Sequence, residues 1–492
     1  MASNPHQDDM DHDNLLDAED VAEEILQGED DVAMDSDGDD ELVLQNDSIA
    51  YFDLPQDSLF AIAQHPQHPN IIAVGGSAGQ EDNAPGAGWL FDTSAARSRP
   101  VLPASYASDP AASAPSNTQL ESTATIDGHT DSINTLAWTL PRGEVLLSGG
   151  LDGRIRAWRL ESAERGGLAL LGEAQEVEEV NWIAPCPSPA YPDTFALGAS
   201  NGSVWVYTVD RADAADPLQI VQSYFLHTAS CTGGAWTADG QLLATISEDS
   251  SLYVWDVWGA AAAANITGDN GQSVVSLTGE DQRFEVPGGL YSLAVDPKGA
   301  FVAVGGAGGQ IRVVSLPRLV APGQPGSSSS KKGKGGAGGN DPSAGGQILA
   351  SLQTQADSVE TLAVAVTSST PPTTLLAAGS VDGSICVYDA SRRFAVRKNL
   401  VGAHEDHSVV KVEFVPGTWL LTSCGMDGVV RRWNLRASGA TGASAAESGL
   451  LKELKGHMGG GEGGGVLGFV QGKTGEMIVT AGDDGVSLVF EA

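Results

Sequence analysis

The sequence predicts an all-β protein built from internal repeats. Along most of its 492 residues, short runs rich in β-branched and aromatic residues alternate with Gly, Asp, Asn and Pro turns, and long amphipathic helical patterns are absent. Glycine supplies 61 residues, about one in eight against a usual ~7%, which indicates many tight turns. A chain of this length could form about three domains or one large domain built from repeats. Internal repeats in the sequence would favour the single domain.

One unit recurs with constant spacing. In its clearest copy His129 precedes Trp138 by nine residues, Ser148 precedes Asp152 by four, and Asp152 precedes Trp158 by six. A second copy has the same three intervals, carried by His227, Trp236, Thr245, Asp249 and Trp255. Two copies that agree at three intervals indicate a structural repeat.

Further copies are weaker but follow the same spacing. Ser423, Asp427 and Trp433 match well, whereas the unit at 309–314 is degenerate because it lacks both the Asp and the aromatic residue. The residues that end the units number eight: Phe91, Trp158, Tyr207, Trp255, Val314, Tyr388, Trp433 and Phe490.

These residues resemble the WD repeat. Its name-giving dipeptide is present as Trp255-Asp256, and its Gly-His dipeptide as Gly128-His129. The resemblance covers residues 48–492 and implies four-stranded blades. Eight units then predict one all-β domain, an eight-bladed WD-repeat β-propeller, preceded by a disordered acidic N-terminal tail.

The resemblance also implies a buried hydrogen-bond relay in the blades. Its predicted members are His129, Ser148, Asp152, Trp158, His227, Thr245, Asp249, Trp255, Ser423, Asp427 and Trp433. Buried polar groups need partners, so these positions come as a set. A Ser-His-Asp catalytic triad uses the same residue types, but a unique active site would not recur in several copies.

The ends of the repeat region predict how the ring closes. The last unit stops near Phe490 after three strands, while the β-pattern at 48–54 precedes the first unit without partners of its own. We therefore expect 48–54 to be the outer strand of the last blade, where it covers an exposed edge. Flexible insertions are expected at about 93–119 and 322–347, the second rich in Gly and Ser.

Charge and composition narrow the classes of partner. The formal charge is −38, and residues 1–47 hold 18 of the 64 Asp and Glu residues but no Lys or Arg, which predicts a disordered tail. This balance disfavours nucleic acid and anionic membranes as partners and favours a cationic one. Four widely spaced cysteines, no apolar run of about 18 residues and no signal-peptide pattern favour a cytoplasmic protein, and they leave entry into the nucleus open as an alternative.

No motif indicates catalysis, a cofactor or a metal. The chain lacks a P-loop, an HExxH pair and a nucleophile elbow. The densest ligand-like cluster is His404-Glu-Asp-His407, but one of its histidines is needed for a blade relay. We therefore expect no enzyme activity, with function located on the propeller surface.

Carboxylates recur where the repeat places loops on one rim. Asp57, Asp131 and Asp357 occupy one equivalent position, each followed by Ser, and Glu178 and Glu360 fall three residues further along the unit. Glu405 and Asp406 lie in the corresponding loop of another blade, and Glu248 and Asp483 precede hairpin turns. A ring of carboxylates would attract a peptide rich in Lys and Arg. The alternative is that Asp is simply common in such turns.

A narrower resemblance suggests the partner. The N-terminal part of the chain is similar to one WD-repeat lineage. The similarity consists of an acidic tail followed by Asn46-Asp-Ser-Ile-Ala-Tyr-Phe52, Asp57-Ser-Leu-Phe-Ala-Ile62, His65-Pro66 and the Gly75-Gly76 turn. That lineage comprises the fungal ribosome-assembly chaperone of large-subunit ribosomal protein ten and the animal angio-associated migratory cell protein. The resemblance implies a monomeric cytoplasmic chaperone that binds the basic N-terminal segment of that ribosomal protein and supports assembly of the 60S subunit. The alternative is a general scaffold in signalling or ubiquitin ligation.

Overall fold

The computed structural model describes residues 45–79, 81, 84–97, 118–162, 167–268, 270–319, 345–436, 449–459 and 464–492. These residues belong to one compact unit, Leu44–Ala492. Residues 1–44, which make up nearly all of the predicted tail, lie outside the described part, as do 98–117 and 320–344 from the two predicted insertions.

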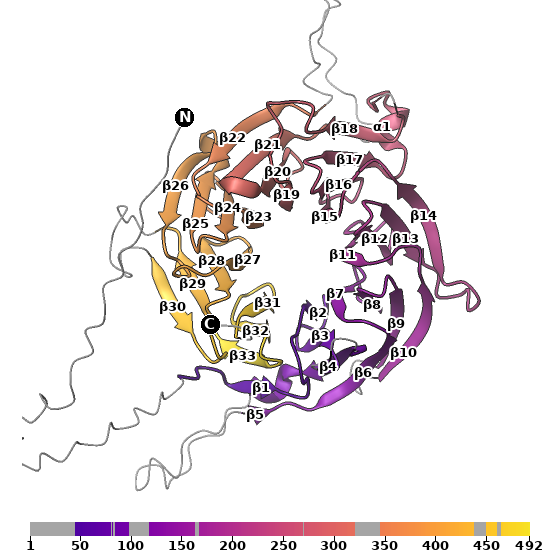
Figure 1. Ribbon diagram of the computed structural model, residues 1–492, viewed down its shortest axis with the longest axis vertical. Helices are drawn as coiled ribbons and strands as arrows, with labels where there is room; N and C mark the ends of the chain where they lie inside the picture. The colour runs from indigo at the N-terminus through magenta and orange to yellow at the C-terminus, as the bar shows by residue number, and fades with distance from the viewer. Residues whose placement is uncertain are drawn as a thin grey trace, which may run out of the picture. The chain divides into compact units, whose positions relative to one another are not determined.

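Eight sheets, antiparallel except for one added strand in the last, follow one another round a central axis, so the predicted eight-bladed propeller is confirmed (Figure 1). Blades 1 and 2 consist of β2 (Ala61–Gln64), β3 (Ile71–Ser77), β4 (Gly86–Asp92) and β6 (Ser122–His129), then β7 (Ile133–Trp138), β8 (Val145–Gly150), β9 (Ile155–Ser162) and β10 (Gly167–Ala174). Blades 3 and 4 consist of β11 (Val180–Pro185), β12 (Thr194–Ala199), β13 (Val204–Val209) and β14 (Leu218–Tyr224), then β15 (Cys231–Trp236), β16 (Leu242–Ser247), β17 (Leu252–Asp256) and β18 (Ser273–Leu277).

The remaining blades keep this order from the axis outward. Blades 5 and 6 consist of β19 (Leu290–Val295), β20 (Phe301–Gly306), β21 (Gln310–Ser315) and β22 (Ile348–Gln353), then β23 (Val359–Val366), β24 (Thr374–Ser380), β25 (Ile385–Asp389) and β26 (Ala395–Leu400). Blade 7 consists of β27 (Val409–Phe414), β28 (Leu420–Gly425), β29 (Val430–Asn434) and β30 (Leu450–Leu454). Blade 8 consists of β31 (Val466–Val470), β32 (Met477–Gly482), β33 (Ser487–Glu491), β1 (Ala50–Phe52) and β5 (Thr118–Gln119).

Helical segments in the described residues are short. They are α1 (Ala260–Ala263), η1 (Thr93–Arg97), η3 (Ala307–Gly309) and η4 (Ala390–Arg392). The degenerate unit at 309–314 still forms a complete blade, β19 to β22, because its alternating apolar residues pack although its polar relay is missing.

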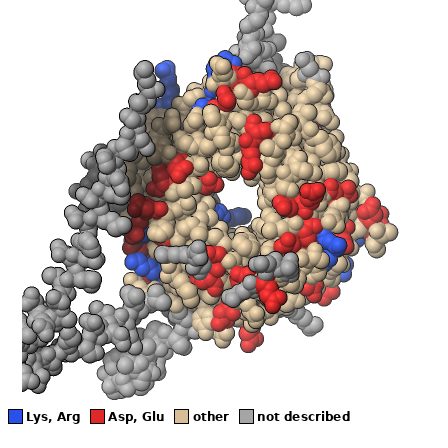
Figure 2. All heavy atoms as spheres, in the orientation of Figure 1, with Lys and Arg blue, Asp and Glu red and all other residues tan. Residues whose placement is uncertain are grey.

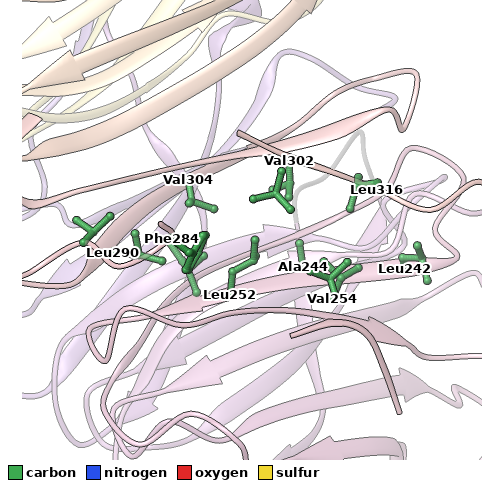
Figure 3. Close-up of a cluster of buried hydrophobic side chains, with 13 residues drawn as sticks. Leu242, Ala244, Leu252, Val254, Phe284, Leu290, Val302, Val304 and Leu316 are labelled. Carbon is green, nitrogen blue, oxygen red and sulfur yellow. The ribbon is translucent and has the colours of Figure 1, made fainter. Parts of the chain in front are cut away.

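The core lies between neighbouring blades. The second strand of each blade is buried on both faces, as in β8, because each blade is covered by a blade on either side. Between blades 4 and 5, Leu252 and Val254 point toward Val302 and Val304, with Phe284 beside them (Figure 3). Burial of these apolar side chains is the main term that holds one blade to the next.

The N-terminal strand closes the ring. β1 pairs antiparallel with β33, with Ala50 opposite Val489, so a strand within the expected segment 48–54 seals the last blade. β1 is not the outermost strand as we expected, because β5 adds to it in parallel. The expected insertion 93–119 is therefore ordered at both ends, in η1 and β5.

Truncating Phe52 is expected to weaken this closure. The Phe52 side chain is fully buried and stacks on Phe91, with ring centroids 4.7 Å apart. Phe52→Ala should lower the free energy of unfolding by about 3–5 kcal/mol in a chemical denaturation experiment. Removal of residues 1–41 is the control, and it should leave the melting temperature nearly unchanged because the acidic segment has few apolar residues to bury. Equal stability of Phe52→Ala and wild type would contradict the role of β1.

Candidate functional site

The predicted hydrogen-bond relay is present in blade 2. His129 Nδ1 lies 3.1 Å from Asp152 Oδ1 and its Nε2 lies 2.9 Å from Ser148 Oγ, which also accepts a 2.9 Å bond from Trp158 Nε1. Burial would raise the pKa of Asp152, but hydrogen bonds from His129 and from the backbone N–H groups of Thr130 and Arg154 lower it. The carboxylate thereby ties the loop before β7 to the β8–β9 hairpin.

The second relay contains a residue that sequence reasoning missed. His227 Nε2 and Trp255 Nε1 each lie 2.8 Å from Thr245 Oγ1, as predicted, but His227 Nδ1 contacts Ser251 Oγ at 2.6 Å rather than Asp249. Ser251 Oγ in turn donates to Asp249 Oδ1. The hydroxyl is interposed because Ser251 follows the hairpin turn and its side chain points back into the blade.

Two further histidines complete relays in blades 7 and 8. His404 bridges Ser423 Oγ at 2.8 Å and Asp427 Oδ1 at 2.9 Å, so it is the relay member of the cluster His404–His407. His457 bridges Thr480 Oγ1 at 2.7 Å and Asp484 at 3.0 Å, and it was not predicted. The dipeptide Gly456-His457, which repeats Gly128-His129, was the signal for it.

The relays are structural in their geometry. Ser148, Thr245, Ser423 and Thr480 are fully buried, so their hydroxyls cannot meet a substrate. Each relay joins a loop that enters an innermost strand to the hairpin between the second and third strands. The polar network therefore fixes the conformation of the loops at one rim.

Acid should weaken the relays, because the pKa shifts of their members predict that stability decreases as the pH falls. Burial lowers the pKa of His404 below 6.5, while bonds to His404 and Arg431 overcome burial and lower the pKa of Asp427 from 3.8 to about 2. Both groups bind fewer protons in the folded state, so their stabilisation is complete above about pH 7 and is lost as the pH falls.

The expected result is a free energy of unfolding that decreases as the pH falls below 6.5 and more steeply below 4. His404→Gln is the matched variant, since Gln355 fills the corresponding place in blade 6 and donates to Ser384 Oγ at 3.1 Å. That variant should show a flatter profile between pH 5 and 7 in denaturant melts. Identical profiles for both proteins would contradict the assignment.

Two kinds of loop meet at one rim of the propeller. Strand direction alternates within a blade, so the loop before the first strand and the hairpin between the second and third strands lie at the same end. Hydrogen bonds join them in blades 2 to 8, for example Leu151 N to Ser132 O at 3.0 Å and Val381 N to Ser358 O at 3.0 Å. Hairpin glycines allow the next blade to approach: a Cβ on Gly153 would lie 2.1 Å from Val177 O.

Eight of the nine predicted partner-binding carboxylates belong to these loops, and the ninth, Glu360, is the second residue of the innermost strand β23. The nine are Asp57, Asp131, Glu178, Glu248, Asp357, Glu360, Glu405, Asp406 and Asp483. Asp57 and Asp483 are half-buried and the other seven are exposed. The nine therefore lie on one rim rather than on opposite faces.

The Asp-Ser pairs build the loops as well as carrying charge. Oδ1 of Asp131 and of Asp357 accepts the N–H of the following Ser at 2.6 Å and 2.7 Å. Ser58 Oγ donates to Asp483 Oδ1 at 2.6 Å and thereby joins blade 1 to blade 8. The turn role that sequence analysis held as the alternative is thus real, and it orients the carboxylates.

One predicted alignment was wrong. Glu178 does not lie three residues beyond the Asp position; like Asp131 and Asp357, it lies two residues before its innermost strand. The missing His-to-Trp spacing in blade 3 shifted the alignment. Glu360 does lie three residues after Asp357, as the second residue of β23.

Two pKa shifts reflect the carboxylates near the innermost strands of blades 4 to 6. Desolvation and the charge of Asp357 raise the pKa of Glu360. Burial and the charges of Glu248 and Glu360 raise the pKa of Tyr291, on the innermost strand between them. Tyr291 therefore lies near both Glu248 of blade 4 and Glu360 of blade 6, and Asp357 lies close to Glu360.

Lysine and arginine do not neutralise this rim within the described ranges. None of the nine carboxylates forms an ion pair there, and nearby cations pair with other groups: Arg154 with Glu173 at 3.2 Å, Arg283 with Asp281 at 2.6 Å and Arg431 with Glu453 at 2.8 Å. Figure 2 shows Asp and Glu side chains around the central opening of the ring. As far as the described residues go, the nine rim carboxylates therefore present negative charge that no lysine or arginine pairs with.

Sequence reasoning missed further carboxylates of these loops. Glu176 and Glu179 flank Glu178, and Glu280 lies in the loop between β18 and β19; all three are exposed. The run Glu176-Val-Glu-Glu179 directly before β11 was the available signal.

Two other kinds of feature would bear on function in the residues that the structure describes: metal-ligand clusters and membrane-spanning helices. In that part of the chain, no three His, Cys, Asp or Glu side chains are grouped so as to hold a metal ion. Nor does any described helix have the length and apolar character needed to cross a membrane.

Comparison with known proteins agrees with this architecture. The model of the WD domain, G-beta repeat, matches residues 120–159, 218–256 and 346–389. These matches fall on the blade 1–2, blade 3–4 and blade 5–6 portions of the ring.

Solved and curated relatives cover between 74% and 95% of the chain. The structure of Chaetomium thermophilum Sqt1 bound to the N-terminus of the ribosomal protein L10 is 54% identical, with a TM-score of 0.76, over 91% of this chain and 100% of that one. The ribosome assembly protein SQT1 of Saccharomyces cerevisiae is 27% identical over 95% of this chain and 92% of that protein. The human angio-associated migratory cell protein is 22% identical over 74% of this chain and 68% of that protein.

Proposed function

The chain belongs to the Sqt1 family of WD-repeat ribosome assembly proteins, and from that premise we propose that it is a dedicated chaperone of a large-subunit ribosomal protein. It binds the basic N-terminal segment of that protein through the acidic rim and supports assembly of the 60S subunit. A relative that is 54% identical is seen with the N-terminus of ribosomal protein L10.

The uncompensated rim is the observation that carries the proposal. Burial and the charge of Asp357 raise the pKa of Glu360, and a Lys or Arg placed beside these two carboxylates would relieve their repulsion. Opposite charge also steers the segment to the rim and speeds association. The relays below the rim hold the loops still, which reduces the entropy lost on binding.

The same charge explains how a chaperone would protect its client. A free basic segment binds the phosphates of RNA without sequence preference. Carboxylates on the rim compete for those cations and repel RNA, so the client is shielded until it is handed over. We place this action in the cytoplasm and assign it to a monomer.

The proposed role is non-enzymatic. All four cysteines are buried, and burial raises the pKa of Cys231 and Cys424 to about 12, so they are protonated thiols rather than nucleophiles. The hydroxyls of the relays are also inaccessible.

The direct test is titration of the chain with a peptide that spans the N-terminus of ribosomal protein L10, over a range of salt concentrations. We expect binding that weakens as salt screens the rim. A peptide with its Lys and Arg residues replaced by Gln should bind far more weakly. Binding that is independent of both salt and the loss of these charges would refute the electrostatic mechanism. In a separate affinity purification, recovery of many unrelated partners without ribosomal proteins would favour a general scaffold.

A further inference from the structure

Two adjacent apolar side chains are exposed on the outer part of the same rim. Phe225 and Leu226, in the loop between β14 and β15, are 64% and 39% exposed. The Phe225 ring meets Trp205 of β13 edge-to-face, with centroids 5.6 Å apart. Single exposed apolar residues need no explanation, but a contiguous aromatic and aliphatic group on a charged rim marks a contact surface.

The aromatic part of this patch is held in place. Trp205 Nε1 donates to Ser203 Oγ at 3.0 Å, and Ser203 Oγ donates to Asn201 Oδ1 at 2.6 Å. The other side of the patch is supported by Tyr207, whose ring lies 6.4 Å from that of Trp205. A fixed aromatic surface loses little conformational entropy when a partner binds.

Carboxylates lie on the other side of one hairpin from this patch. The turn at 200–203 receives the loop before β11 on one side, through a 3.3 Å bond from Ser200 N to Glu179 O. It receives the loop 225–230 on the other side, where a Cβ on Gly202 would lie 2.6 Å from Ala229 O. The hairpin therefore separates the exposed carboxylates Glu176, Glu178 and Glu179 from Phe225 and Leu226.

We infer that Trp205, Phe225 and Leu226 form an apolar subsite for a side chain of the bound basic segment, one whose neighbouring Lys or Arg pairs with Glu176, Glu178 or Glu179. This inference rests on the proposed function and adds how the segment is placed along the rim. Charge attracts any basic segment, whereas an apolar side chain that fits one place sets the register and excludes segments without it.

The test measures how tightly two variants of the full chain bind the L10 N-terminal peptide, at about 0.05 M and about 0.3 M salt. The double variant Phe225→Ser, Leu226→Ser removes the apolar surface and should weaken binding about 10- to 30-fold at both salt concentrations, the range of an interface anchor. The matched control is Ile220→Ser in the same blade, 52% exposed on β14, which should bind as wild type does. Replacing the apolar residues of the peptide one at a time should identify one whose loss weakens binding to wild type but not to the double variant.

The outcomes separate this inference from the proposed function. Wild-type affinity of the double variant, together with weakened binding by a rim charge reversal, would overturn the apolar subsite and leave the chaperone function intact. Wild-type affinity of both kinds of variant would overturn both. Thermal melts confirm that each variant is folded.

Discussion

Reversing charge at Asp357 and Glu360 is expected to abolish most of the affinity for the basic segment. The double variant Asp357→Lys, Glu360→Lys should weaken binding of the L10 N-terminal peptide about 30- to 100-fold at low salt, about 2–3 kcal/mol. Each substitution removes an attraction of the size found for exposed pairs and adds a repulsion of similar size. The effect should shrink as salt rises, because screening weakens both.

The structure supplies a matched control for this experiment. Asp216, in the connection between β13 and β14, is exposed at the opposite end of its blade from the rim loops. Asp210 is exposed in the same connection. The double variant Asp210→Lys, Asp216→Lys changes the net charge by the same amount and should leave affinity nearly unchanged. Equal losses of affinity in both double variants would mean that binding depends on the net charge of the protein rather than on the rim carboxylates. Glu360→Lys alone separates charge from loop structure, since Asp357 also accepts the N–H of Ser358.

Truncation of Trp255 is expected to cause a large loss of stability. Trp255 is fully buried, stacks on Tyr224 with centroids 4.2 Å apart, and donates to Thr245 Oγ1 at 2.8 Å. Trp255→Ala should lower the free energy of unfolding by about 3–5 kcal/mol, because it leaves a cavity in the cluster between blades 3 and 4.

Trp255→Phe divides this loss into two parts. It keeps most of the apolar contact but removes the indole N–H, so its cost should be about 1–2 kcal/mol, the range for a lost hydrogen bond to a buried acceptor. Chemical denaturation of the three proteins measures both values. A melt of Trp255→Ala that matches wild type would show that the relay does not stabilise the blade.

Much of the ring could be predicted because its determinants are local. The intervals from His129 to Trp138 and from Asp152 to Trp158 reflect strand and turn lengths, which repeat wherever a blade repeats. The glycine that follows Asp152 has φ of 72°, as a tight hairpin requires, and so it marks the turn in the sequence. Exposed Glu360 and Asp131 could likewise be named from their positions in the unit.

Other features could not be predicted because they depend on approach between distant segments. Ser251 enters the blade 4 relay only because the hairpin turns its hydroxyl toward His227. The pairing of β5 with β1 joins residues 68 positions apart, Ala50 and Thr118, and no local pattern marks it. The grouping of Phe225 with Trp205 required β14 to pair with β13, which places Tyr224 opposite Val204.

The sequence by itself determined the repeat, the blade number, the segment that closes the ring and the excess of negative charge, because each follows from spacing and composition. Only the tertiary structure decided that nine carboxylates share one rim without an ion pair to any described lysine or arginine, and that an apolar patch adjoins them. Local spacing sets the strands and turns, whereas an electrostatic surface is a sum over loops that only folding brings together.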